Sequence, residues 1–279
     1  MITVNSISGG QTSAYVAAKY EADLDIFSLV RTNDKSCEFK DKKLASLIED
    51  KIQKPFVGTL EDDRIVHTIL ELEQHIGREI TWVSGYTFDE IISQKNGYLP
   101  NKVARYCTTE LKTIPIASYL YEKGLSPVEM RFGYRANETR RANSMNAKLN
   151  ESGIVEVKIK VGKHENGNNK WKTIEYQKPS YPLIKDGIYK DNIVEYWRDK
   201  NVKFAKFNNC VGCWWRNEIM LKKMSEEHPR KMEWFAKKEE TTGNRFKTDI
   251  TYRKIIEHKL QMELFDDDFN DCDSGYCGI

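Results

Sequence analysis

Short apolar runs alternate with amphipathic stretches over the first 145 residues of the chain. Runs of strand length lie at Ile2–Ser6, Asp25–Arg31, Ile80–Ser84 and Pro127–Tyr134. Helix-prone segments separate them, at Thr12–Tyr20, Asp41–Ile52, Asp62–Ile76, Phe88–Gln94, Glu110–Lys123 and from about Glu138. Strands that alternate with helices indicate βαβ units. The pattern therefore predicts an α/β fold, a Rossmann-like parallel sheet with helices on both faces.

The pattern changes after residue 150. Val155, Val157, Ile159 and Val161 alternate with polar residues, and Asn166-Gly167 is a strong turn signal. These features predict a β-hairpin inserted at the sheet edge. Helical spacing then predicts helices at Asn192–Lys200, Asn217–Met224, Pro229–Lys238 and about Ile250–Leu264. The expected organisation is an α/β domain at 1–150 and a hairpin plus a helical, cysteine-containing region at 151–279.

Composition excludes several classes of protein. Lys and Arg number 44 against 42 Asp and Glu, so the net charge of +2 makes no case for a nucleic-acid or membrane partner. No apolar run approaches the 18 or so residues of a membrane span. The first residues lack a basic leader followed by an apolar run, so we expect no secretory signal and a cytoplasmic location. In that reducing compartment, clustered cysteines favour metal or redox chemistry over disulfides.

The segment Ser8-Gly9-Gly10-Gln11-Thr12-Ser13 lies between the first predicted strand and helix. Two glycines allow a sharp turn close to an anion, and the helix start offers unpaired N–H groups and the positive end of its dipole. The hydroxyls of Ser8, Thr12 and Ser13 add donors. The alternative is a Gly-Gly turn with an N-capping hydroxyl. The sequence matches neither the Walker loop nor Gly-x-Gly-x-x-Gly.

Five cations follow on segments near the predicted carboxyl ends of the strands, where open α/β sheets bind ligands: Arg105, Lys112, Arg135, Arg140 and Arg141. Arginine forks bind phosphate oxygens in pairs, so these side chains suit a triphosphate or a phosphosulfate. Glu138 could orient Arg135 or an arginine of the next turn, or help to hold Mg²⁺. The alternative for each cation is a solvated surface charge of little energetic consequence.

Three motifs resemble one family. The Ser-Gly-Gly-x-x-Ser loop resembles the pyrophosphate (PP) loop of the adenine nucleotide alpha-hydrolase superfamily, whose fold is of the HUP type. Arg105-Tyr-Cys-Thr-Thr-Glu-Leu-Lys-Thr-Ile-Pro115 and Gly133-Tyr-Arg-Ala-Asn-Glu-Thr-Arg-Arg141 resemble segments of phosphoadenosine phosphosulfate (PAPS) reductase-like proteins. Tyr181-Pro-Leu-Ile184 is similar more weakly. ATP-using members usually carry Asp where this chain has Thr12.

The cysteines form two tight pairs, Cys210-Val-Gly-Cys213 and Cys272–Cys277, with Cys107 inside the second motif. Close pairs suit one metal ion or one iron–sulfur cluster, and spacing alone does not separate these. The resemblance implies a [4Fe–4S] cluster on Cys107, Cys210 and Cys213, with Cys272 or Cys277 as the fourth ligand. A Zn²⁺ site would instead use Cys210, Cys213, Cys272 and Cys277.

Together the resemblance implies an adenine-nucleotide enzyme of sulfur metabolism. Ser8, Gly9, Gly10, Thr12, Ser13 and Glu138 would bind the cofactor, and Arg105, Lys112, Arg135 and Arg141 would stabilise charge during catalysis. One variant adenylates an acceptor with ATP, releases pyrophosphate and transfers sulfur with the help of the cluster.

A second variant reduces PAPS or a related sulfonucleotide with Cys277 as the tail thiol. A third reading, of another class, is a non-catalytic zinc-stapled module that binds nucleic acid or protein.

The implied partners are an adenine nucleotide, a donor protein for electrons or sulfur, and a nucleic-acid or small-molecule sulfur acceptor. No membrane partner is expected, and the sequence leaves the oligomeric state open.

Overall fold

The structure is a computed structural model that describes residues 1–207 and 209–258. Contacts divide the chain into two compact units. Unit 1 comprises Met1–Ser28, Val66–Val83 and Thr113–Phe204, and unit 2 comprises Leu29–Ile65, Ser84–Lys112 and the chain from Ala205 onward. Neither unit is a continuous stretch such as 1–150 or 151–279, because the chain passes between the units several times.

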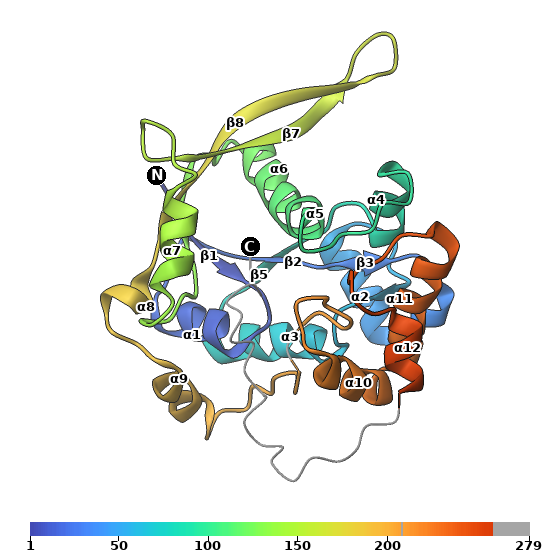
Figure 1. The fold of residues 1–279 in the computed structure, drawn as a ribbon. Coiled ribbons are helices and arrows are strands. Elements are labelled where there is room, and N and C mark those ends of the chain that lie inside the picture. Colours follow the sequence, from blue (N-terminus) through green and yellow to red (C-terminus); the bar gives the residue numbers. More distant parts are fainter. Residues whose placement is uncertain (208, 259–279) are drawn as a thin grey trace. The chain divides into compact units, whose positions relative to one another are not determined.

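Unit 1 contains a sheet of six strands in the order β5-β2-β1-β6-β8-β7 (Figure 1). The strands are β1 (Thr3–Ile7), β2 (Leu24–Ser28), β5 (Ile80–Val83), β6 (Val128–Arg131), β7 (Val155–Lys163) and β8 (Asn169–Ser180). Every neighbouring pair is parallel except β7 with β8. The predicted α/β fold with a mostly parallel sheet is therefore confirmed, and this arrangement is consistent with a Rossmann-like fold.

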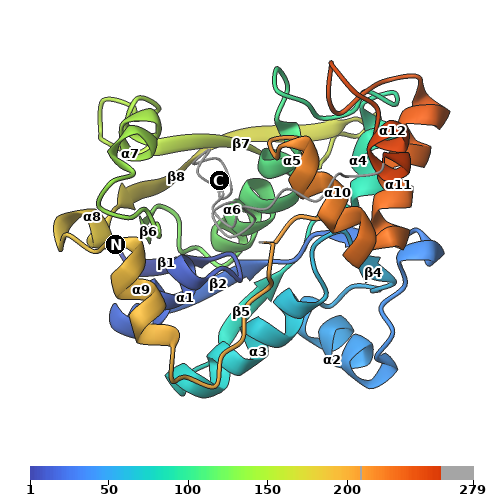
Figure 2. The same cartoon turned by 60° about the horizontal axis from the view of Figure 1, so that its bottom comes forward.

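Helices cover both faces of this sheet. In Figures 1 and 2, α1 (Gln11–Lys19) and α3 (Arg64–Ile76) lie on one face and α6 (Ile114–Glu122) lies on the other. The remaining helices of unit 1 are α7 (Thr139–Asn146), α8 (Pro182–Lys185) and α9 (Lys190–Trp197). Burial from both sides explains why Val4, Ile26 and Met130 on the central strands are all 0% exposed.

Strands β7 and β8 form an antiparallel hairpin, and β7 is the outermost strand of the sheet. Gly167, within the turn that Asn166-Gly167 predicted, has a φ of 81°. The alternation of Val157 and Ile159 with lysines predicted the hairpin correctly, because one face of β7 packs against α6.

Unit 2 is mainly helical. It contains η1 (Lys35–Cys37), α2 (Lys42–Ile52), α4 (Phe88–Gln94), α5 (Tyr106–Thr108), the π-helical η2 (Thr109–Thr113), α10 (Glu218–Glu227), α11 (Pro229–Thr242) and α12 (Tyr252–Glu257). Two short strands, β3 (Arg31–Thr32) and β4 (Gly58–Thr59), pair antiparallel. The expected single helix Glu110–Lys123 is divided into η2 and α6, with Pro115 in the first turn of α6, where proline is well tolerated.

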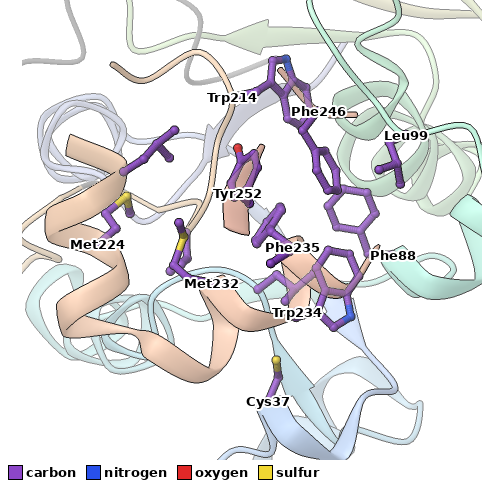
Figure 3. Close-up of a cluster of buried hydrophobic side chains, with 14 of the residues drawn as sticks. Cys37, Phe88, Leu99, Trp214, Met224, Met232, Trp234, Phe235, Phe246 and Tyr252 are labelled. Atoms are coloured by element: carbon purple, nitrogen blue, oxygen red, sulfur yellow. The ribbon is translucent and has the colours of Figure 1, made fainter. Parts of the chain in front are cut away.

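Aromatic side chains fill the centre of unit 2 (Figure 3). Trp234, Phe235, Phe246 and Tyr252 are each 1% exposed or less, and Trp214 is 2% exposed. The rings of Phe235 and Tyr252 stack at a centroid distance of 5.4 Å. Trp214 therefore belongs to the core of unit 2. Across the described residues, no helix combines the length and apolar character needed to cross a membrane.

Candidate functional site

The loop between β1 and α1 is held by one buried side chain. The Ser13 hydroxyl donates to the Gly10 carbonyl oxygen at 3.1 Å and accepts from the Ser8 N–H at 3.1 Å. It also contacts the Ser8 hydroxyl at 3.0 Å. Gly9 adopts a φ of 83°, and Gly10 is the N-cap of α1. Ser13 therefore fixes the shape of the loop from within.

The start of α1 suits an anion. A glycine N-cap offers no side-chain oxygen to the first turn, and that turn contains no acidic residue. The amide N–H groups of a helix start and the positive end of its dipole both attract negative charge. Strand β1 ends at Ile7, so the loop lies at the carboxyl edge of the sheet, the edge at which ligands bind in open α/β folds.

Gly133 lets a second segment touch this loop. Strand β6 lies parallel to β1, so both strands end at the same edge. A Cβ atom at Gly133 would lie 3.1 Å from the Ser13 nitrogen and 3.2 Å from the Thr12 carbonyl carbon. Only a residue without a side chain permits such an approach at no cost. The Gly133–Arg141 segment and the Ser8–Ser13 loop therefore form one structure, which we call the loop site.

Within the loop site, Glu138 binds two arginines. Its Oε2 accepts from the Arg135 backbone N–H at 2.8 Å and from Arg135 Nε at 3.1 Å. Its Oε1 accepts from Arg141 Nη1 at 2.8 Å. Burial alone would raise the pKa of Glu138, but these hydrogen bonds and the two positive charges lower it. The side chains are partly buried, with 11–18% exposure, which protects the interaction from solvent.

An aromatic stack supports Arg141. The Arg141 guanidinium carbon lies 4.2 Å from the centre of the Tyr134 ring, a cation–π contact. Tyr134 stacks on Tyr181 with ring centres 5.5 Å apart and planes 12° apart. Sequence reasoning assigned Tyr134 no role. Two features of the sequence could have indicated a role for Tyr134. It lies between Gly133 and Arg135 in a family-like motif, and Tyr181 begins the weakly similar segment.

The other predicted cations lie elsewhere. Arg140 is exposed on α7. Arg105 and Lys112 belong to unit 2, with the described cysteines. Arg105 faces the ring of Trp215, with the guanidinium carbon 6.0 Å from its centre. Lys112 Nζ donates to Glu61 Oε1 at 2.8 Å. Within unit 1, Glu138 brings together Arg135 and Arg141, and Gly133 of the same segment lies against the loop.

In unit 2, a short antiparallel contact places Cys210 beside Glu61. The Asp62 N–H donates to the Asn209 carbonyl oxygen at 2.7 Å, and the Val211 N–H donates to the Leu60 carbonyl oxygen at 3.0 Å. Gly212 follows with a φ of +67°, and a Cβ atom there would lie 2.5 Å from the Phe235 ring. The turn between Cys210 and Cys213 is therefore fixed against the aromatic core of unit 2.

Cys107 packs against the hydrophobic core of unit 2, which includes Val211 and Trp214 from the segment around Cys210 and Cys213. Burial raises the pKa of Cys107 to about 12, with a further contribution from negative charge at Cys213. Burial lowers the pKa of Lys112, but the Glu61 carboxylate, then Cys210 and Cys107, raise it by more. Lys112 is therefore a cation held among a carboxylate and two thiols. A thiol with the pKa of Cys107 stays protonated at neutral pH unless a cation or metal compensates the charge.

Two charged side chains of this region are buried with unpaired atoms. Arg216 is 7% exposed, and its Nε and Nη2 find no hydrogen-bond partner among the described residues. Glu61 is 1% exposed, and its Oε2 is likewise unpaired within the described chain. The Arg216 N–H donates to the Cys213 carbonyl oxygen at 3.0 Å. Buried polar groups without partners are rare and call for an explanation such as a bound group.

A metal centre on the described residues alone is not supported. No group of three or more His, Cys, Asp or Glu side chains in 1–207 and 209–258 is arranged to hold a metal ion. Among the described residues, no disulfide involves Cys37, Cys107, Cys210 or Cys213. Cys272 and Cys277, which the sequence assigned to complete the metal site, lie outside the described residues. We call Cys107, Cys210, Cys213, Lys112, Glu61 and Arg216 the cysteine region.

Comparison with known proteins identifies no relative. A scan against protein-family models and searches of curated proteins and of solved structures found no match.

Proposed function

We propose that this chain is a PAPS reductase-like enzyme with a PP-loop, which binds an adenine nucleotide at the loop site and acts in sulfur transfer or activation. The observation that carries the proposal is the close approach of Gly133 to Thr12 and Ser13. It joins two of the three family-like motifs at the carboxyl edge of a parallel sheet. One motif offers a helix start and the other offers arginines, and both kinds of group favour phosphate oxygens.

The residues of the loop site suit a group with several negative charges. Arg135 and Arg141 stay oriented because Glu138 binds both and Tyr134 supports Arg141. Such preorganised cations stabilise charge that develops during a reaction. Both Glu138 oxygens already accept from arginine, which favours the orienting role over the role of a Mg²⁺ ligand. With ATP, an acceptor would form a bond to the α-phosphorus, and the bond to the bridging oxygen would break to release pyrophosphate.

Some features of the cysteine region favour a bound metal cofactor. Cys107 packs against the same core as Trp214, the neighbour of Cys213, and it belongs to the [4Fe–4S] ligand set but not to the zinc set. The two unpaired guanidinium nitrogens of Arg216, Nε and Nη2, suit the negative charge of a thiolate-bound cluster. Cys107, Cys210 and Cys213 would hold such a cluster with Cys272 or Cys277. When bound, it would supply one-electron transfer.

One observation favours reduction of a sulfonucleotide as a second candidate. Thr12 stands where ATP-using members of the similar family usually carry Asp, so a direct carboxylate contact with a nucleotide-bound metal is missing there. In this variant PAPS replaces ATP. A thiolate would attack the sulfur of the sulfate group, and the bond from that sulfur to the phosphate oxygen would break to release adenosine 3′,5′-bisphosphate. A donor protein would then supply the two electrons that release sulfite from the resulting thiosulfonate. Cys277, the predicted tail thiol, lies outside the described residues.

Calorimetric titration with ATP and PAPS tests the nucleotide site. Arg135→Gln and Arg141→Gln should each weaken binding by ten-fold or more, about 1.4 kcal/mol. Arg140→Gln is the matched control, because Arg140 is the exposed neighbour of Arg141 and should leave binding unchanged.

Product analysis of the anaerobically purified protein then separates the reactions: pyrophosphate from ATP supports adenylation, and sulfite from PAPS supports reduction. Absence of affinity for both nucleotides would overturn the proposal and leave the zinc-stapled binding module.

A further inference from the structure

The β7/β8 hairpin extends beyond the sheet as a two-stranded ribbon (Figure 1). Strand β6 pairs with β8 only from Gln177 to Ser180, whereas β7 pairs with β8 from Asn169 to Gln177. A ribbon of two strands without a hydrophobic face of its own is marginally stable in water. The distal hairpin therefore depends on one covered face, and its other face is left to solvent.

The register assigns the side chains to these two faces. Cross-strand partners lie on the same face, so Ile159 with Lys172 and Val157 with Ile174 form one face. Ile159 is 1% exposed and Ile174 is 6% exposed, and Lys172 Nζ donates to the Tyr121 hydroxyl of α6 at 2.9 Å. This face packs on α6.

The opposite face is basic and carries an aromatic ring. Lys160 lies opposite Trp171, and Lys158 lies opposite Thr173. Lys163, which pairs with Asn169, lies on the same face because 169, 171 and 173 alternate along β8. Trp171 is 47% exposed, and Lys158 Nζ lies 5.9 Å from the centre of its ring. An indole exposed to this degree contributes little to the core and can stack on a ligand.

The charge of the ribbon differs from that of the chain as a whole. Residues 158–173 contain five lysines and one glutamate, although the full chain has a net charge of only +2. The acidic pair Glu156 and Glu175 lies at the base of the exposed face, nearer the sheet. Positive charge is therefore gathered on the distal part of the hairpin, as expected for the footprint of a polyanion.

We propose that the exposed face of the β7/β8 ribbon, formed by Lys158, Lys160, Lys163 and Trp171, binds single-stranded nucleic acid. The lysines of this face would pair with phosphates, and Trp171 would stack on an unpaired base. Proteins bind single-stranded nucleic acid by this combination of contacts. A membrane surface fits less well, because Trp171 is flanked by Thr173 and Asn169 rather than by further apolar side chains. This binding surface does not depend on the nucleotide chemistry of the loop site.

Fluorescence anisotropy of a labelled 20-nucleotide oligo-dT strand, titrated with the full chain at several salt concentrations, tests the lysines. Replacing Lys158, Lys160 and Lys163 together by Gln should weaken binding at least ten-fold. It should also reduce the slope of log affinity against log salt concentration by about 2, because each lost phosphate contact accounts for ~0.7 of that slope. The control replaces Lys35, Lys40 and Lys43, three exposed lysines elsewhere, by Gln with the same loss of charge. It should leave the affinity within about two-fold.

Two substitutions test the ring. Trp171→Ala should weaken binding by about 5- to 100-fold, and Trp171→Phe should restore most of the affinity, because stacking needs only an aromatic face. Circular dichroism of each variant verifies the fold. The proposal is overturned if oligo-dT does not bind at low salt, if the lysine triple behaves like its control, or if Trp171→Ala has no effect. Equal affinity for a DNA duplex, or tighter binding to anionic lipid vesicles, would also overturn it.

Discussion

The loop site and the cysteine region both contain clusters of charged side chains, but the two clusters differ in how completely these side chains are hydrogen-bonded and paired. In the loop site, Glu138 pairs with Arg135 and Arg141, and the arrangement is complete within the protein. In the cysteine region, Lys112 pairs with Glu61, yet two guanidinium nitrogens of Arg216 and one oxygen of Glu61 are buried without hydrogen-bond partners in the described residues. The charged side chains of the loop site are therefore held in place before any ligand binds. The cysteine region instead contains unpaired buried atoms that a bound group would satisfy.

This difference has an energetic meaning. Paired and hydrogen-bonded charges stabilise their own geometry, whereas a buried unpaired charge costs free energy until something compensates it. Substitutions in the loop site should therefore affect binding with modest loss of stability. Substitutions in the cysteine region should change stability strongly, and in a manner that depends on whether a metal is bound.

The largest effect is expected from Gly212→Ala in the cysteine region. The new Cβ atom would lie 2.5 Å from the Phe235 ring at a residue with φ of +67°. Overpacking and left-handed strain together should lower the free energy of unfolding by about 2–4 kcal/mol. Gly243→Ala is the matched control, because Gly243 has a φ of +68° with nothing within 4 Å and should lose only about 1 kcal/mol. Urea denaturation measures both, and equal losses would contradict the assigned contact.

Arg216→Met should change the free energy of unfolding by about 1–3 kcal/mol. Whether it raises or lowers this free energy should depend on whether a metal cofactor is bound. In metal-free protein the substitution removes a buried guanidinium with two unpaired nitrogens, so we expect the melting temperature to rise. If the proposed cluster is bound in protein purified anaerobically, the iron and sulfide content should fall, because the cluster would lose a compensating charge. A substitution that lowers stability in metal-free protein would show that Arg216 is already satisfied.

The sequence predicted the loop site better than the cysteine region, for a physical reason. The strand, the turn at Gly9 and Gly10, and the helix after it are encoded by local periodicity, and Glu138 reaches Arg135 and Arg141 within one helical turn. The contact of Lys112 with Glu61 joins residues 51 positions apart, and no local pattern encodes it. The same holds for the two compact units, each assembled from three separate segments. The stacking of Tyr134 on Tyr181 is likewise a tertiary contact without a periodic signal.

A smaller effect, dependent on pH, is expected from Glu138→Gln. Paired with Arg135 and Arg141, Glu138 has a pKa below its ordinary value of 4.5 in the folded protein. Its ionised form therefore stabilises the fold above that pH, and the contribution is lost as pH falls through the folded-state pKa. Near neutral pH the variant should be less stable by about 1–2 kcal/mol. Denaturation at several pH values should show this difference shrinking below about pH 4.5, whereas a constant difference would argue against the ionic network.

The smallest effect on stability, with a larger one on binding, should come from Gly133→Ala. The added methyl group would lie 3.1–3.2 Å from backbone atoms of Thr12 and Ser13, so these must shift by a few tenths of an ångström. We expect a loss of about 1 kcal/mol in unfolding free energy, at the low end for overpacking. Because the displaced backbone is the start of α1, nucleotide affinity should fall by more than this loss predicts. Parallel measurement of urea denaturation and of ATP and PAPS titration separates the two quantities. Unchanged affinity in a folded variant would mean that the close approach of Gly133 serves packing alone, and the loop site would lose its main support.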